Sequence, residues 1–270
     1  MKPTQIFKEY PIKIAFKKVL AILLSKMPLI SNKYFLINYY GGKIYLNLRE
    51  SHMMIQRAFG VYEYWKTHLV MDLVKPGMVV VDVGANKGYF SLLFAKLMED
   101  KGKVLSFEPD PNNCFWIKKS IKTNKYNSIK LYQIALSDKN GEATFYPGKK
   151  SGWGSLFLSK SAASDKKPFK VKTRKLDDIL KEEGIEHIDL IKIDVEGADL
   201  LVLKGAENTL KKSNNVKLIM DIDVKSKNER QQVFKFLISC GFKIHSIGKK
   251  LKCIEKIDEL KSKDIFATKY

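Results

Sequence analysis

Residues 79–88 constrain the fold of this chain more than any other segment. They read Val-Val-Val-Asp-Val-Gly-Ala-Asn-Lys-Gly, a run of strand-forming residues followed by a turn with two glycines. A second apolar run, residues 104–107, ends in Glu108. A glycine turn between a strand and a helix lets the backbone approach a ligand, and a carboxylate at the end of the next strand suits a ribose diol. The two segments therefore predict a nucleoside-binding crevice at the carboxyl ends of parallel strands.

Apolar runs alternate with amphipathic segments along the rest of the chain, which is typical of an α/β protein. We expect strands near residues 78–83, 103–108, 129–135, 188–194 and 216–222, with helices near 88–98, 111–125, 199–211 and 228–239. Closing strands are expected at 242–247 and 264–268, and a hairpin insertion at about 140–175. The predicted fold is a Rossmann-like, mostly parallel seven-stranded sheet with helices on both faces, and residues 61–270 form this domain.

The first 60 residues are expected to form an extension of that domain. Residues 1–30 mix lysines with apolar side chains, which predicts one or two amphipathic helices. These helices could pack on the core, or they could lie as a basic helix on a membrane surface. Residues 39–48 predict a small hairpin, and residues 51–74 are expected to be helical.

The chain carries 49 lysine and arginine residues against 29 acidic ones, a net charge of +20. This excess predicts attraction to anions such as nucleic acid or anionic lipid. Only four of the cations are arginine, the side chain that binds phosphate in a bidentate way, so the lysines could equally be solvated surface. The three cysteines are far apart, so we expect them to be buried small side chains or free thiols in a reducing compartment. Since no apolar run reaches the roughly 20 residues that span a bilayer, we expect a cytoplasmic protein, with a peripheral position at the membrane possible.

Four motifs in this order resemble the FkbM-type S-adenosylmethionine-dependent methyltransferases. They are Asp-Val-Gly-Ala-Asn-x-Gly at 82–88, Phe-Glu-Pro at 107–109, Ala-Leu-Ser-Asp at 135–138 and Ile-Asp-Leu-Ile-Lys-Ile-Asp-Val-Glu-Gly-Ala at 188–198. The resemblance covers about residues 60–224. It implies a class I methyltransferase fold, S-adenosylmethionine as cofactor, and O-methylation of a sugar, glycan or other small-molecule hydroxyl.

Each part of S-adenosylmethionine needs a different kind of protein group. The tail carboxylate suits the backbone N–H groups after Gly84, Asp82 can orient the turn or reach the tail ammonium, and Glu108 can accept from both ribose hydroxyls. Glu63 is placed near the ammonium by the resemblance alone. The full predicted cofactor set is Glu63, Asp82, Gly84, Ala85, Asn86, Gly88, Glu108, Pro109, Ala135, Leu136, Ser137 and Asp194.

Methyl transfer is expected at the end of the strand near 188–194. We predict Asp194, Glu196 and Lys192 as its catalytic residues, without deciding which one removes the acceptor proton. Trp153 and Ser155, in a glycine-rich loop, are predicted to contact the substrate. Asp221 and Asp223 are weak candidates for holding a divalent metal with Asp194, because two polar residues at a strand end more often have no metal.

Other functions stay open at this point. An RNA methyltransferase would explain the basic surface, although arginine is scarce. A nicotinamide-dependent oxidoreductase would use the same ribose carboxylate, but Gly-Ala-Asn-Lys-Gly is not Gly-x-Gly-x-x-Gly. A non-catalytic cofactor-binding module is a further possibility. The expected partners are a small-molecule or glycan acceptor, with peripheral contact to an anionic membrane possible, and nucleic acid as the less favoured alternative.

Overall fold

The computed structural model describes residues 3–25, 33–50, 52–149, 152–158, 166–222, 227–260 and 263–269. Its helices are α1 (Pro3–Glu9), α2 (Ile12–Leu24), α3 (His52–Ala58), α4 (Tyr64–Leu73), α5 (Tyr89–Leu97), α6 (Pro111–Asn124), α7 (Leu176–Glu182), α8 (Asp199–Gly205), α9 (Glu207–Lys212), α10 (Lys227–Ser239) and the short η1 (Ile257–Glu259). Its strands are β1 (Tyr34–Tyr39), β2 (Gly42–Asn47), β3 (Val79–Val83), β4 (Lys103–Phe107), β5 (Ile129–Tyr132), β6 (Ala135–Leu136), β7 (Gly141–Phe145), β8 (Phe169–Arg174), β9 (Leu190–Ile193), β10 (Lys217–Asp221), β11 (Lys243–Ser246), β12 (Lys252–Ile254) and β13 (Asp264–Thr268).

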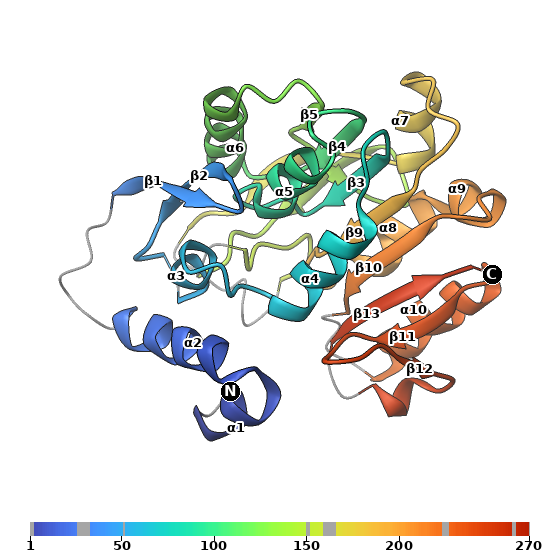
Figure 1. Ribbon diagram of the computed structural model, residues 1–270. Coiled ribbons are helices and arrows are strands. Elements are labelled where there is room, and N and C mark those ends of the chain that lie inside the picture. The colour runs from blue at the N-terminus through green and yellow to red at the C-terminus, as the bar shows by residue number, and fades with distance from the viewer. Residues whose placement is uncertain are drawn as a thin grey trace.

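A central sheet organises the described part of the chain (Figure 1). Its strand order is β12-β11-β13-β10-β9-β3-β4-β5. The strands from β10 to β5 pair in parallel, whereas β13 runs antiparallel to both β10 and β11. The mostly parallel α/β fold is confirmed. The sheet has eight strands in place of the expected seven, because the short β12 pairs with β11 and extends the edge.

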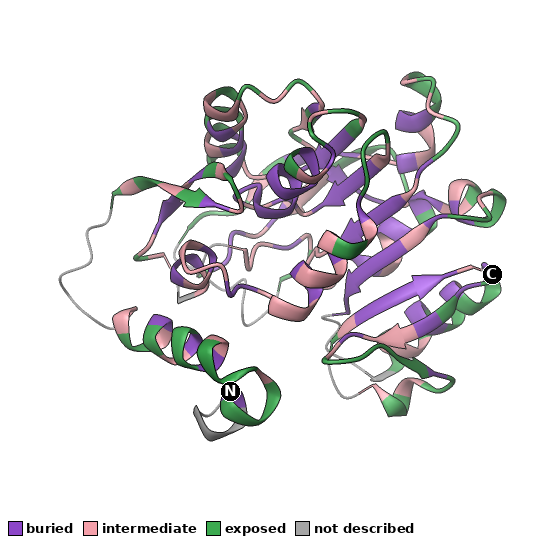
Figure 2. Cartoon of the chain, viewed as in Figure 1, coloured by how far each residue is buried: buried purple, intermediate pink, exposed green. Residues whose placement is uncertain are grey.

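Nearly every residue of the parallel strands β3, β4, β9 and β10 is buried, which requires that the sheet is covered on both faces. On one face, Val80 and Val104 pack in a cluster with residues of α4 and α5. On the other face, Val81 and Leu105 pack with residues of α7, α8, α9 and α10. The buried residues therefore concentrate in the sheet and in the inward sides of its helices (Figure 2).

Part of the N-terminal extension shares this core. Ile44 and Leu46 of the β1–β2 hairpin are fully buried in the cluster that contains α5. The hairpin is tied to α6 by hydrogen bonds, one of them from the Tyr45 N–H to the Ser120 hydroxyl at 3.2 Å. The domain boundary near residue 60 stays a prediction.

The helix expected over residues 51–74 is two helices, α3 and α4. Gly60 and Glu63 have φ angles of +65° and +42°, which no α-helix contains, so the chain turns between them. This break brings Glu63 to the start of α4, close to the end of the sheet. The helix expected over residues 199–211 is likewise divided into α8 and α9.

The predicted insertion forms a second, three-stranded sheet with the order β6-β8-β7. Its antiparallel pair, β7 and β8, corresponds to the expected hairpin. The central strand expected near residues 129–135 ends at Tyr132, and Ala135 and Leu136 pair instead with β8 as β6. Among the described residues, no helix combines the length and the apolar character needed to cross a bilayer.

Candidate active site

A pocket opens at the carboxyl ends of β3, β4 and β9, where the sequence predicted a nucleoside crevice. The predicted residues that line it are Glu63, Gly84, Asn86, Glu108, Pro109, Ala135, Leu136, Trp153, Ser155, Asp194, Glu196 and Asp221. Five further predicted residues are outside its lining, namely Asp82, Ala85, Gly88, Ser137 and Lys192. Asp223 lies outside the described residues.

The turn between β3 and α5 depends on one glycine. Gly84 has a φ angle of +78°, and a Cβ at this position would overlap the carbonyl oxygen of Asp194. Glycine therefore allows the ends of β3 and β9 to meet at the pocket. The N–H groups of Gly84 and Ala85 donate to the Phe107 carbonyl at 3.0 Å. The N–H groups after Gly84 were expected to bind a ligand carboxylate, but that of Ala85 is engaged in the protein, because the turn uses it together with the Gly84 N–H to hold the end of β4.

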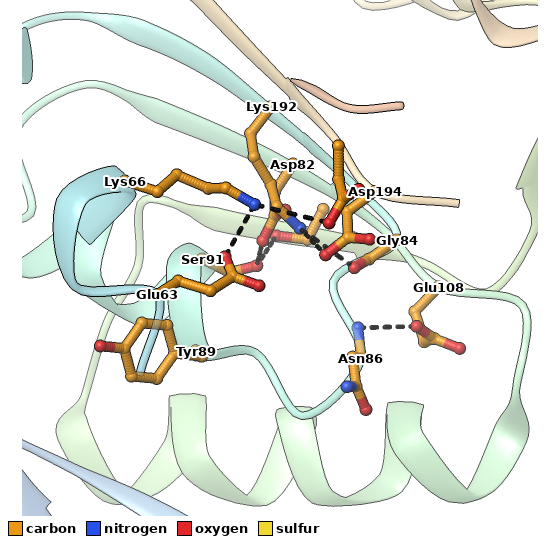
Figure 3. Close-up of polar contacts among 12 residues, drawn as sticks. Glu63, Lys66, Asp82, Gly84, Asn86, Tyr89, Ser91, Glu108, Lys192 and Asp194 are labelled. Carbon is orange, nitrogen blue, oxygen red and sulfur yellow. Dashed lines mark hydrogen bonds and ion pairs between the residues drawn. The ribbon is translucent and has the colours of Figure 1, made fainter. Parts of the chain in front are cut away.

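Glu108 is 4% exposed and lies at the pocket wall after β4. Its carboxylate accepts a hydrogen bond from the Asn86 N–H at 2.7 Å (Figure 3). It also accepts from the Asp110 N–H at 2.9 Å and from the Asn113 side-chain amide at 3.2 Å. Burial raises the pKa of Glu108 to about 7, although these hydrogen bonds oppose the rise. Three fixed donors hold the carboxylate in one orientation, and its remaining lone pairs can accept from a diol.

Asp82 and Lys192 are buried next to the pocket residue Asp194 (Figure 3). Asp82 is fully buried and accepts from the Ser91 hydroxyl at 2.6 Å. The Lys192 ammonium is 3.5 Å from the Asp82 carboxylate and 3.4 Å from that of Asp194. The contacts of Asp82 agree with one of its two expected roles, orienting the turn. Its contact with a ligand ammonium and the catalytic role of Lys192 stay predictions. Asp82 anchors α5 through Ser91, and Lys192 holds Asp194.

A second buried lysine organises the charges near the end of β10. The Lys66 side chain is 1% exposed, and its ammonium lies 2.9 Å from Glu63 and 2.8 Å from Asp264. It is also 4.0 Å from Asp221, which has a shorter ion pair of 2.8 Å with Lys263. The lysines come from α4 and from the residue before β13, so this cluster joins distant parts of the chain.

The three pocket carboxylates of this region differ in their proton affinity. Burial acts to raise the pKa of Asp194, but Lys192, Lys66 and Lys263 outweigh it and hold the pKa at about 2. Burial also opposes ionisation of Glu63, yet Lys66 keeps its pKa below the ordinary value. Asp221 behaves in the opposite way, since burial raises its pKa to about 7 despite Lys66 and Lys263. Two carboxylates therefore stay ionised at neutral pH, and the third is poised to exchange a proton.

The same three carboxylates form a possible cation site. Their oxygen atoms, one each from Glu63, Asp194 and Asp221, lie within 4.8 Å of one another. Carboxylate oxygens suit a hard divalent ion, but an ion here would compete with the ammonium groups of Lys66 and Lys263. Metal binding at Asp221 stays a weak prediction.

The glycine-rich loop of the insertion forms another wall of the pocket. Trp153 lines the pocket and is partly exposed. Ser155 is 2% exposed, and its hydroxyl donates to the Glu196 carbonyl at 2.8 Å and accepts from the Phe157 N–H at 3.1 Å. The Ser155 hydroxyl thus holds the loop against the turn after β9. A substrate that contacts this hydroxyl would have to do so beside the two backbone groups it already binds.

Several pocket residues were not predicted. Glu50, Met53 and Tyr62 come from the N-terminal segment, where the sequence motifs gave no signal. Lys87 was visible inside the glycine-rich motif, and its ammonium lies 3.5 Å from Glu50. The three-residue spacing between Glu63 and Lys66 could have suggested an ion pair on one helix.

Comparison with known proteins points to one family. Residues 82–244 match the family described as "Methyltransferase FkbM domain". The chain is 34% identical to the 2-O-methyltransferase NoeI of Sinorhizobium fredii, over 54% of this chain and 64% of NoeI. It is 27% identical to the hexuronic acid methyltransferase AglP of Haloferax volcanii, over 55% of this chain and 58% of AglP. Each match therefore covers less than two thirds of the relative's own length.

A solved structure supports the fold. The methyltransferase FkbM from Methylobacillus flagellatus KT superposes with a TM-score of 0.51 at 15% sequence identity. The similarity covers 82% of this chain and 54% of the other. At this identity it bears on the fold alone.

Proposed function

Because the chain belongs to the FkbM methyltransferase domain family, we propose that it transfers a methyl group from S-adenosylmethionine to a hydroxyl of a sugar, glycan or other small molecule. Membership of this family supports a methyltransferase over a nicotinamide-dependent oxidoreductase. The observation that carries the finer proposal is the pocket, which gathers Glu108, Asp194 and Asp221 from the ends of three strands.

The pocket fits the chemical parts of S-adenosylmethionine. Glu108 is held by three donors at the wall, where its free lone pairs suit the ribose hydroxyls. Glu63 and Asp194 both stay ionised and line the same pocket, which suits the ammonium of the amino-acid tail. When bound, this cofactor supplies an electrophilic methyl group.

The chain's own contribution to the transfer is orientation and proton removal. A hydroxyl acceptor must lose its proton, and a carboxylate with a pKa near the working pH accepts it best. Asp221 has such a pKa, about 7, and lines the pocket beside Asp194. We assign it the role of proton acceptor, with Lys66 and Lys263 stabilising its ionised form. Asp194, with a pKa of about 2, is too weak a base for this role.

Two relatives and the side chain of Trp153 support a saccharide as the methyl acceptor. NoeI is named as a 2-O-methyltransferase and AglP as a hexuronic acid methyltransferase. Trp153 offers an aromatic face in the pocket wall, and aromatic faces pack well on sugar rings. A saccharide hydroxyl is therefore the preferred acceptor.

Transfer of a labelled methyl group tests this proposal. The protein is incubated with methyl-labelled S-adenosylmethionine and separated glycan, metabolite and RNA fractions. We expect the label in the glycan or metabolite fraction, in a form that resists mild alkali, because a methyl ether survives treatment that hydrolyses a methyl ester. Asp221→Asn should abolish transfer, whereas Asp72→Asn, which changes an exposed aspartate of α4, should not. Label in RNA, or label released by alkali, would contradict the proposal.

A further inference from the structure

Helix α2 exposes four large apolar side chains that a helix packed only on a core would bury. Ile12, Phe16, Leu20 and Leu23 are 68%, 62%, 46% and 57% exposed. At 3.6 residues per turn these four positions form one stripe along the helix. The opposite side, which faces the protein, carries the buried residues Ala15, Lys18 and Ala21. Figure 2 shows α2 at the periphery, with exposed and buried residues alternating along it.

The stripe is continued by α1 and bordered by lysines. Phe7 is 39% exposed, and its ring lies 5.2 Å from that of Phe16 in an edge-to-face arrangement. Lys13 and Lys17 are exposed beside the stripe, and α2 contains no acidic residue. In α1, the charges of Lys8 and Glu9 offset each other. The surface formed by Phe7, Ile12, Phe16, Leu20 and Leu23 with Lys13 and Lys17 is called the α2 face below.

We propose that the α2 face docks the protein on the surface of an anionic membrane. An apolar stripe flanked by cations is the arrangement of helices that lie in the plane of a bilayer, where the apolar side chains enter the acyl boundary and the lysines contact anionic headgroups. A second copy of this chain fits the face less well. A two-fold contact would bring Lys13 and Lys17 of each copy near the other's, and both copies carry a net charge of +20.

Because of the position of α2, this docking would bring the membrane surface close to the pocket. α2 packs on α3, with the Lys18 ammonium donating to the Gln56 side chain at 3.2 Å. α3 also carries Met53, which lines the pocket. A membrane bound by the α2 face therefore lies one helix away from the pocket wall, so an acceptor carried on a lipid could reach it. This consequence rests on the proposed function, whereas the docking itself does not.

Binding to vesicles tests the docking without any activity measurement. The intact protein is sedimented with vesicles of phosphatidylcholine alone, or of phosphatidylcholine with 30% phosphatidylglycerol. We expect binding to the anionic vesicles only. Lys13→Gln/Lys17→Gln should weaken it about 30-fold, roughly fivefold for each charge near the surface. Phe16→Glu/Leu20→Glu should weaken it at least tenfold, because both apolar side chains are lost from the acyl boundary.

A matched control separates the α2 face from the general basic surface. Lys235→Gln/Ile238→Glu makes similar changes at exposed positions of α10 and should leave binding unchanged. Circular dichroism would establish that each variant is folded. Equal binding by the Phe16→Glu/Leu20→Glu variant and the parent would overturn the proposal. So would binding to neutral vesicles as strong as to anionic ones, or a stable dimer in light scattering that the same variant dissociates.

Discussion

Lys66 offers the sharpest test of the charge cluster beside the pocket. Its side chain is 1% exposed and forms ion pairs with Glu63 and Asp264, whose side chains are 17% and 31% exposed. Replacing it by methionine keeps most of the volume but leaves these acids, and the nearby Asp221, without this cation. Removing one partner of a buried ion pair costs about 3–5 kcal/mol. Because Asp264 keeps some contact with water, we expect Lys66→Met to lower the free energy of unfolding by about 3 kcal/mol at pH 8.

The pH dependence of this loss follows from the sign of the pKa changes. Without Lys66, burial would give the carboxylates of Glu63 and Asp221 higher pKa values in the folded state than in the unfolded chain. Their destabilising effect is complete above the folded-state pKa values and is relieved as the pH falls through them. Lys66→Met should therefore be closer in stability to the parent at pH 5.5 than at pH 8.

Urea unfolding at both pH values measures these differences. Lys101→Met is the control, because it also deletes an ion pair, with Glu99, but both side chains are more than 60% exposed. It should change the free energy of unfolding by less than about 0.5 kcal/mol. Adding Asp264→Asn to Lys66→Met should restore part of the loss. A loss below about 1 kcal/mol for Lys66→Met, or one that is equal at the two pH values, would refute this interpretation of the cluster.

Two further predictions concern the turn and the proton acceptor. Gly84→Ala should lower the free energy of unfolding in urea by at least about 3 kcal/mol, because φ is +78° and the new Cβ would overlap the Asp194 carbonyl. A loss within about 0.5 kcal/mol would show that the turn after β3 and the turn after β9 are not closely packed. Methyl transfer by the parent should rise as the pH increases through about 7, since Asp221 must be deprotonated to act, and Asp72→Asn should keep this profile. A parent rate that is flat between pH 6 and 8 would remove Asp221 from this role.

The elements that local patterns define could be predicted from the sequence. β3, β4 and β9 are mostly apolar runs, and each ends within a residue or two of a glycine or an acid. Parallel strands bring their carboxyl ends to one edge, so Glu108 and Asp194 could be placed at one crevice without knowing the packing between them. The structure brings both to the same pocket.

What the sequence did not reveal depends on contacts between distant segments. Lys66 and Asp264 meet only because β13 pairs with β10 near the start of α4. The spacing of residues along the chain does not predict this contact. The periodicity of α2 predicted an apolar side, but it could not tell that this side faces outward, because that depends on how the small residues Ala15 and Ala21 fit the protein. The break before α4 was missed because it rests on a left-handed φ at Glu63, a residue type that rarely adopts it.

Titration calorimetry with S-adenosylmethionine tests the central claim, that the pocket at the ends of β3, β4 and β9 binds this cofactor through Glu108. The parent should bind it, and Glu108→Gln should bind at least about tenfold more weakly, because hydrogen bonds to a charged group contribute about 1.5–3 kcal/mol. Glu186→Gln, a change at an exposed site away from the pocket, should bind like the parent. Saturation by NADH with no heat from S-adenosylmethionine, or unchanged affinity in Glu108→Gln, would contradict the claim.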